Sequence, residues 1–213
     1  MKRRLFPDAQ LRLGAEANKA ALLSLRTPRI LHIGTHGFFL EDIAQPAASN
    51  ARAKLQVPQL GGVAQCPSDP LLRSGIVLAG ADVSGDHSLL TALELAGLNL
   101  WGTELVVLSA CDSGRGEIKR GQGVYGLRRA LIVAGAETVV TSLWSVNDET
   151  TATLMESYYQ HLLAGRGRAA ALREAMLSVR AQKPHPHYWA PFISIGKDGP
   201  LKVIPQQATA SAL

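Results

Sequence analysis

The sequence has few aromatic residues, two cysteines and no long apolar run, and each shortage removes a class of protein. Phe, Trp and Tyr make up 5% of the 213 residues, so the interleaved aromatic and basic pattern of a nucleic-acid binder is missing. No apolar run reaches the length of about 18 residues that a membrane-spanning helix needs. The basic start of the chain is not followed by the apolar segment of a secretory signal. We therefore expect neither nucleic acid nor a membrane as a direct partner.

The two cysteines, Cys66 and Cys111, stand in a chain without an export signal. Because disulfides persist in oxidising compartments, we expect free thiols and a cytoplasmic protein. The formal net charge of +5 comes from basic residues scattered along the chain, which is typical of a solvated surface. His185 and His187 have no Cys or acidic residue beside them, so we expect no metal site there, and no cofactor.

The rest of the composition fits one α/β domain. Hydrophobic residues make up 46% of the chain, which is enough to fill a core. Short apolar runs predict buried strands, and helical spacing of apolar residues predicts helices. The predicted strands are 29–39, 75–80, 103–111, 137–145 and 192–196, and the predicted helices are 15–25, 89–97, 124–135, 148–163 and 168–182. Their alternation predicts a three-layer α/β/α fold with a mostly parallel central sheet.

Three segments of unusual composition accompany this domain, which we place at 11–200. Residues 1–10 form a polar leader, and residues 201–213 form a tail that we expect to be flexible. Residues 41–74 are rich in Ala, Pro, Gln and Gly and predict a long loop or insertion.

Two chemically reactive residues end predicted strands. His36 lies at the carboxyl end of the predicted strand 29–39, and Cys111 closes the strand 103–111. Sites in such sheets gather beyond the carboxyl ends of the strands, and a histidine beside a thiol supplies the thiolate character that attack on a carbonyl needs. Each residue alone also fits a buried structural role. His32, further inside the strand, is the better candidate for a structural histidine.

Backbone amides beside these residues are candidates for an oxyanion site. Gly37 has no side chain to shield its N–H, and the Cys111 N–H stands at the end of the predicted strand 103–111. Two such donors would stabilise the negative oxygen of a tetrahedral intermediate.

Six segments strengthen the assignment because they occur together and in order. They are LHIGTHGFF, SGIVLAGAD, LTALELAGLNL, ELVVLSACDSGRGE, GQGVYGLRRALIVAGAETVVTSLWSVNDETTATLMESYY and HPHYWAPFISIG. Over residues 11–197 they resemble the CHAT domain, a caspase-like module related to separases and often found after tetratricopeptide repeats. The resemblance implies a caspase–haemoglobinase fold and cysteine endopeptidase activity, with His36 as general base and Cys111 as nucleophile.

The same resemblance bears on partners and completeness. It implies a protein or peptide substrate and a regulatory protein or tetratricopeptide-repeat region, with activation by a partner or ligand. CHAT domains usually carry a strand and a helix before the segment that begins near Leu11, so the first strand of the sheet is expected to be missing in part.

Asp148 is the candidate for substrate recognition. Separases share the segment LW-x-V-x-D, in which the aspartate binds a basic P1 side chain, and LWSVND matches it. The resemblance therefore implies cleavage after Arg or Lys, through a carboxylate–cation pair. A capping box from Ser145 to Asp148 at the start of a helix is the structural alternative.

Two other functions compete with the peptidase. A catalytically silent CHAT module would serve as an interaction scaffold, although silent relatives commonly lack His36 or Cys111. Gly121, Gly123 and Gly126 match the GxGxxG motif of a dinucleotide-binding domain, with Asp148 downstream as the candidate for the ribose hydroxyl. However, about ten mostly polar residues separate the preceding strand from Gly121. The required strand-to-glycine turn is thus absent from the sequence.

Overall fold

The computed structural model describes residues 5–39, 70–79, 88–112, 122–144 and 147–202. Most of the predicted loop 41–74, Cys66, and the glycine-rich segment that follows Cys111 lie outside these ranges. The last residues of the predicted loop form helix α3 (Pro70–Arg73) and begin strand β2.

The described strands form one six-stranded sheet in the order β3-β2-β1-β4-β5-β6. The strands are β1 (Ile30–Phe39), β2 (Ser74–Val77), β3 (Leu89–Thr91), β4 (Leu105–Asp112), β5 (Thr138–Ser142) and β6 (Phe192–Gly196). The helices are η1 (Gly14–Glu16), α2 (Lys19–Leu23), α4 (Ala92–Ala96), α5 (Gln122–Val133), α6 (Asp148–Leu163), α7 (Arg168–Gln182) and α8 (Pro186–Trp189).

The sheet is mixed, with its parallel part in the centre. β1, β4 and β5 pair in parallel, whereas β2, β3 and β6 join antiparallel at the two sides. The α/β prediction is confirmed. Fewer of the described strands pair in parallel than expected, because β2, β3 and β6 run antiparallel to their neighbours. In the described part of the chain the sheet edges are β3 and β6, so any additional strand would have to join one of these two.

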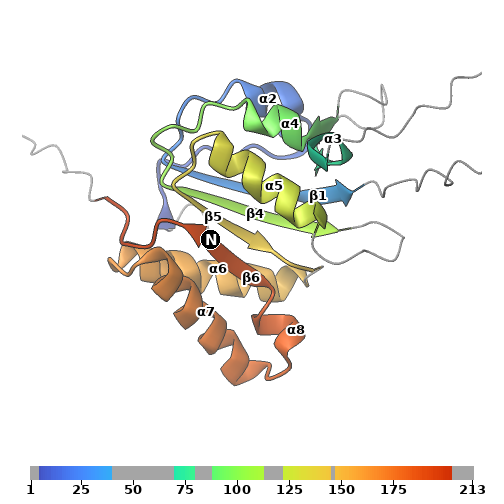
Figure 1. Ribbon diagram of the computed structural model, residues 1–213. Helices are drawn as coiled ribbons and strands as arrows, with labels where there is room; N and C mark the ends of the chain where they lie inside the picture. The colour runs from blue at the N-terminus through green and yellow to red at the C-terminus, as the bar shows by residue number, and fades with distance from the viewer. Residues whose placement is uncertain (1–4, 40–69, 80–87, 113–121, 145–146, 203–213) are drawn as a thin grey trace, which may run out of the picture.

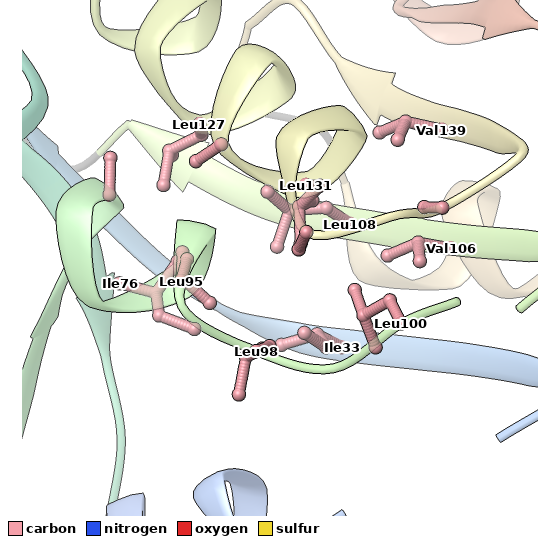
Figure 2. Packing of buried hydrophobic residues seen from close by; sticks show 14 of the residues in the cluster. Ile33, Ile76, Leu95, Leu98, Leu100, Val106, Leu108, Leu127, Leu131 and Val139 are labelled. Carbon is pink, nitrogen blue, oxygen red and sulfur yellow. The ribbon is translucent and has the colours of Figure 1, made fainter. Parts of the chain in front are cut away.

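Helices cover both faces of the sheet and complete the three layers (Figure 1). On one face, α2, α4 and α5 enclose a cluster that contains Ile33, Ile76, Val106 and Leu131 (Figure 2). On the other face, α6 and α7 enclose a second cluster, the α6-side cluster, whose members include Leu105, Val107, Val140, Leu154, Tyr158, Tyr159 and Phe192.

Local sequence explains why the central elements form where they do. Residues 105–108 of β4 are buried on both faces, which fits an inner strand of consecutive Leu and Val. Thr91 and Glu94 form a capping box that starts α4, each satisfying an amide that the helix leaves without a partner. Glycine at position 75 lets the ring of Phe38 lie against β2, since a Cβ atom there would stand 2.5 Å from that ring.

A cluster of charges holds the amino ends of the central strands. It consists of Arg29, Glu104, Glu137, Arg168 and Lys202, and we call it the amino-edge charge cluster. One guanidinium nitrogen of Arg168 donates to Glu104 at 3.2 Å and to Glu137 at 3.1 Å, while Arg29 donates to Glu104 at 2.5 Å. The Lys202 amide donates to Glu104 at 2.7 Å, and the Lys202 ammonium donates to Glu137 at 3.0 Å.

These contacts decide how the carboxylates ionise. Burial raises the pKa of Glu104, but the hydrogen bonds from Lys202 and Arg29 and the nearby Arg charges outweigh it, so the pKa lies below its usual value. The Lys202 hydrogen bond chiefly lowers the pKa of Glu137. Both groups therefore stabilise the fold as carboxylates.

Candidate active site

The backbone register brings the two reactive residues next to each other. β1 and β4 run in parallel, and His36 is the register partner of Cys111, with Gly37 opposite Asp112. Neighbouring strands lie about 4.8 Å apart. The imidazole-bearing and thiol-bearing positions are thus adjacent on the sheet without any contribution from a loop.

Strand alternation assigns these positions to a face of the sheet. Ile30 and Val107 pack with the α6-side cluster, and His32 contacts Tyr159 of α6. Because every second residue of a strand belongs to the same face, positions 36 and 111 also belong to the face that α6 and α7 cover. His36 itself is exposed.

Strand β1 continues past His36 to Phe39, as the predicted strand 29–39 does. Over these residues it also pairs with β2, so that His36 is opposite Val77 and Gly37 is opposite Ile76. Gly37 is buried, and strands flank it on both sides. Its amide therefore stands inside the sheet, between two neighbouring strands.

His32 is fixed through both ring nitrogens. The hydroxyl of Tyr159 lies 2.8 Å from Nδ1, and Oγ of Ser109 lies 3.1 Å from Nε2. Sequence reasoning proposed a structural role for His32 but missed both partners. Ser109 is two residues before Cys111 on the same face of β4, so the alternation of that strand was the available signal.

Asp148 is the first residue of α6 and is exposed. The helix is capped by Asn147, whose side chain accepts a hydrogen bond from the Thr150 amide at 3.1 Å, so the capping box from Ser145 is not needed to explain it. Among the described residues no hydrogen bond or ion pair of the Asp148 carboxylate occurs. Since β5 is parallel to β4, α6 begins at the carboxyl edge of the sheet, the edge toward which β1 and β4 run.

Helix α8 lies beside the start of α6. The Trp144 indole donates to the His187 carbonyl at 3.2 Å, and the Lys183 ammonium donates to Thr150 at 2.8 Å. Trp189 packs against the α6-side cluster and carries Arg180 over its ring at 5.4 Å. Trp189 thus supports the core at this end of the sheet.

No group of three or more metal-ligating side chains occurs within the part of the chain that the structure describes. No helix in that part has the length and apolar character required to cross a membrane.

Comparison with protein families gives a match along nearly the whole chain. A family model described as the CHAT domain matches residues 2–197. The chain belongs to the CHAT domain family. The CHAT match includes all six strands of the described sheet, together with His36, Cys111 and Asp148.

Two curated proteins resemble this CHAT domain more locally. Tetratricopeptide repeat protein 28 from Mus musculus and that from Homo sapiens are each 38% identical to it over 112 residues, which is 52% of this chain. The aligned part is 4% of each relative. The CHAT domain therefore corresponds to a small portion of a much longer protein in both species.

Proposed function

We propose that this CHAT domain is a cysteine endopeptidase that cleaves a protein substrate with His36 and Cys111. The observation that carries the proposal is the direct register of these two residues on neighbouring parallel strands. The exposure of His36 supports it further, because a general base must reach substrate and solvent. A histidine that served only the core would be expected to resemble His32, with both nitrogens bound inside the fold.

In the proposed reaction His36 accepts the proton of the Cys111 thiol, and the thiolate attacks the scissile carbonyl carbon. The tetrahedral intermediate expels the amine, which takes the proton from His36, and leaves a thioester on Cys111. Water then attacks the thioester with His36 as base, so that the carboxylate product leaves and the thiol is restored.

The amides of Gly37 and Cys111 are the proposed oxyanion donors, as in the family resemblance. Gly37 is paired with strands on both sides. For Gly37 to contribute, its N–H has to turn from a neighbouring strand toward the substrate when the peptide binds.

Asp148 is proposed to bind the P1 side chain and to select Arg or Lys. Its exposure and its place at the carboxyl edge of β5, next to β4, support this role. Because no ion pair of Asp148 occurs among the described residues, its carboxylate is available for a guanidinium or ammonium group of the substrate.

We also propose a cytoplasmic domain whose activity depends on a neighbouring tetratricopeptide-repeat region. The similarity to two relatives named as tetratricopeptide repeat proteins supports such a region as partner. Without its activating partner or ligand, a silent interaction module and an inactive peptidase would differ only in the reactivity of Cys111.

A peptide acyloxymethyl ketone with Arg at P1 tests the peptidase directly. We expect it to form a thioether on Cys111, detected as a mass increase on the peptide that contains this residue. Cys66→Ala should be labelled like the wild type, and Cys111→Ala should not be labelled. Equal labelling of Cys111 by a probe without the peptide part would indicate a merely reactive thiol and would remove the peptidase proposal.

Replacing Asp148 tests the origin of P1 selection. We expect Asp148→Ala to lower kcat/KM for peptides with Arg at P1 by about 10- to 100-fold, the range of a lost charge-assisted hydrogen bond. The measurement is a P1-scanning peptide series compared between wild type and variant.

Glu149→Ala is the matched control, because Glu149 is also exposed and acidic in the first turn of α6. Both substitutions remove a charge that favours the helix N-terminus. Retention of the Arg and Lys preference in Asp148→Ala would show that Asp148 stabilises the helix and nothing more.

A further inference from the structure

On the α6 face of the sheet, burial of the side chains decreases along β1 and β4 toward the proposed catalytic pair. On β1, Ile30 and His32 are half-buried, whereas Gly34 and His36 are exposed. On β4, Val107 is buried and Ser109 is half-buried. Gly34 and Ser109 are register partners. We call this pair of positions the Gly34–Ser109 step; it comes immediately before His36 and Cys111 on the same face of the sheet.

The open space at this step results from the absence of a side chain at position 34. Among the described residues, a Cβ atom built on Gly34 would meet only Oγ of Ser109, at 3.9 Å, within a radius of 4 Å. Two residues along a strand span about 6.6 Å. The step thus lies within one or two residues of an extended peptide whose scissile carbonyl is held at Cys111.

The hydrogen-bond chain beneath this step fixes the protons of Ser109. Burial is the main cause that raises the pKa of Tyr159 above its usual value, and the neighbouring Tyr158 adds to it. The Tyr159 hydroxyl therefore keeps its proton. Buried hydroxyl donors require an acceptor, and Nδ1 of His32 is the partner at 2.8 Å. We therefore assign the ring proton of His32 to Nε2, which donates to Oγ of Ser109 at 3.1 Å.

Ser109 is left with its own proton to donate. A serine hydroxyl has one proton and two lone pairs, and His32 occupies one lone pair. The proton has room on the side of Gly34, where no described residue other than Ser109 comes within 4 Å of the Cβ position. A basic P1 side chain offers no acceptor, whereas a peptide backbone offers a carbonyl oxygen at every residue.

We propose that Gly34 and Ser109 form the floor of the substrate cleft, that the Ser109 hydroxyl donates to a backbone carbonyl of the bound peptide, and that His32 and Tyr159 are positioning residues for this hydroxyl. The inference rests on the proposed peptidase function and adds four residues to it. Gly34 provides the space, Ser109 provides the contact, and the Tyr159–His32 pair sets the direction of the donor.

Steady-state kinetics with a fluorogenic peptide bearing Arg at P1 tests this arrangement. Ser109→Ala and Tyr159→Phe are expected to raise KM by about 3- to 10-fold, the effect of one neutral hydrogen bond, with kcat changed by less than about twofold. Ser109→Thr keeps the hydroxyl and should restore KM. Tyr158→Phe is the control, because the buried Tyr158 hydroxyl has no hydrogen-bond partner in the described structure, and its KM should match the wild type.

Gly34 is tested by filling the space. Gly34→Val is expected to lower kcat/KM by about 10- to 100-fold through overlap with the peptide, while small alkylating reagents still modify Cys111 at the wild-type rate. Gly34→Ala adds one methyl group at an ordinary contact distance from Ser109, and it gives a smaller loss if the valine variant does not fold.

The outcomes separate this inference from the function on which it rests. A wild type that cleaves the peptide, with Ser109→Ala and both Gly34 variants equal to it in KM, overturns the cleft floor and leaves the peptidase standing. A lower Tm with kcat and KM reduced in proportion to folded protein also overturns it, since the residues would then be structural only. A wild type that neither cleaves peptides nor reacts with the P1 probe, even together with the tetratricopeptide-repeat region on which its activity is proposed to depend, overturns both.

Discussion

His36→Ala is expected to reduce kcat/KM for peptide cleavage by about 100- to 10,000-fold, the usual contribution of a general acid–base group. The loss should fall mainly on kcat, because His36 acts on the reacting thiol and the leaving amine and does not bind the substrate. Stability should change by less than about 0.5 kcal/mol, since His36 is exposed. Peptide hydrolysis and thermal unfolding of the same preparations give both quantities.

His161→Ala is a suitable control for the loss of an imidazole. His161 belongs to the last turn of α6, at the opposite end of that helix from Asp148. Its replacement should leave kcat/KM unchanged. Activity in His36→Ala that matched this control would mean that the register with Cys111 has no catalytic use.

Arg168→Met is expected to destabilise the fold by about 3–5 kcal/mol, the cost of removing one partner from a buried ion pair. The Arg168 side chain is 1% exposed and joins Glu104 to Glu137. For a domain of this size, the loss corresponds to a fall in Tm of about 6–20 °C. Calorimetry or circular dichroism would measure it.

Arg173→Met on the same helix supplies the matched control. The Arg173 side chain is 71% exposed and pairs with Glu174, and exposed pairs contribute about 0–1 kcal/mol. A drop in Tm of similar size in the two variants would show that the amino-edge charge cluster has no special share in stability.

The pH dependence of the Arg168→Met effect has a defined sign. The pKa values of Glu104 and Glu137 are lower in the folded protein than their ordinary value of 4.5. The stabilisation is therefore fully present above pH 4.5 and is lost as the pH falls through the lower folded values. The gap in stability between wild type and Arg168→Met should accordingly narrow in acid.

Periodicity predicted two of the long helices and the last strand closely, whereas the helix expected at 124–135 is α5, two residues earlier at both ends. The predicted helices 148–163 and 168–182 and the strand 192–196 coincide with α6, α7 and β6. In these segments the local pattern and the tertiary environment agree, because each places one apolar face on a single cluster. Short segments were less predictable. The expected helix 89–97 begins at Ala92 because residues 89–91 pair with β2 as strand β3.

The direction in which strands pair and their register could not be predicted from the sequence pattern. An apolar run specifies a buried strand but not the sense in which its neighbour runs, and β2 and β6 proved antiparallel. The alignment of His36 with Cys111 depends on which residues of two distant strands are paired, and a slip by one residue would place them on opposite faces. The family resemblance singled out the two residues as a pair, and the register of the sheet shows that they are neighbours.

The contacts of Ser109 and Tyr159 were likewise hidden. Tyr159 reads as one more apolar position of α6, and its hydroxyl becomes meaningful only when His32 lies 2.8 Å away. Asn147 caps α6, so Asp148 stands at the first helical position and not at the third, where a capping box would need it; Ser145 lies outside the described residues.

The amino-edge charge cluster also bears on where this domain can be trimmed. The family match stops at residue 197, yet the Gly199 carbonyl accepts from the Arg168 amide and the Lys202 amide donates to Glu104. A chain that ends at residue 197 would lose the hydrogen bonds that Gly199 and Lys202 make to Arg168 and Glu104, and would expose the buried Glu104 carboxylate to water. Expression trials should therefore keep residues 198–202.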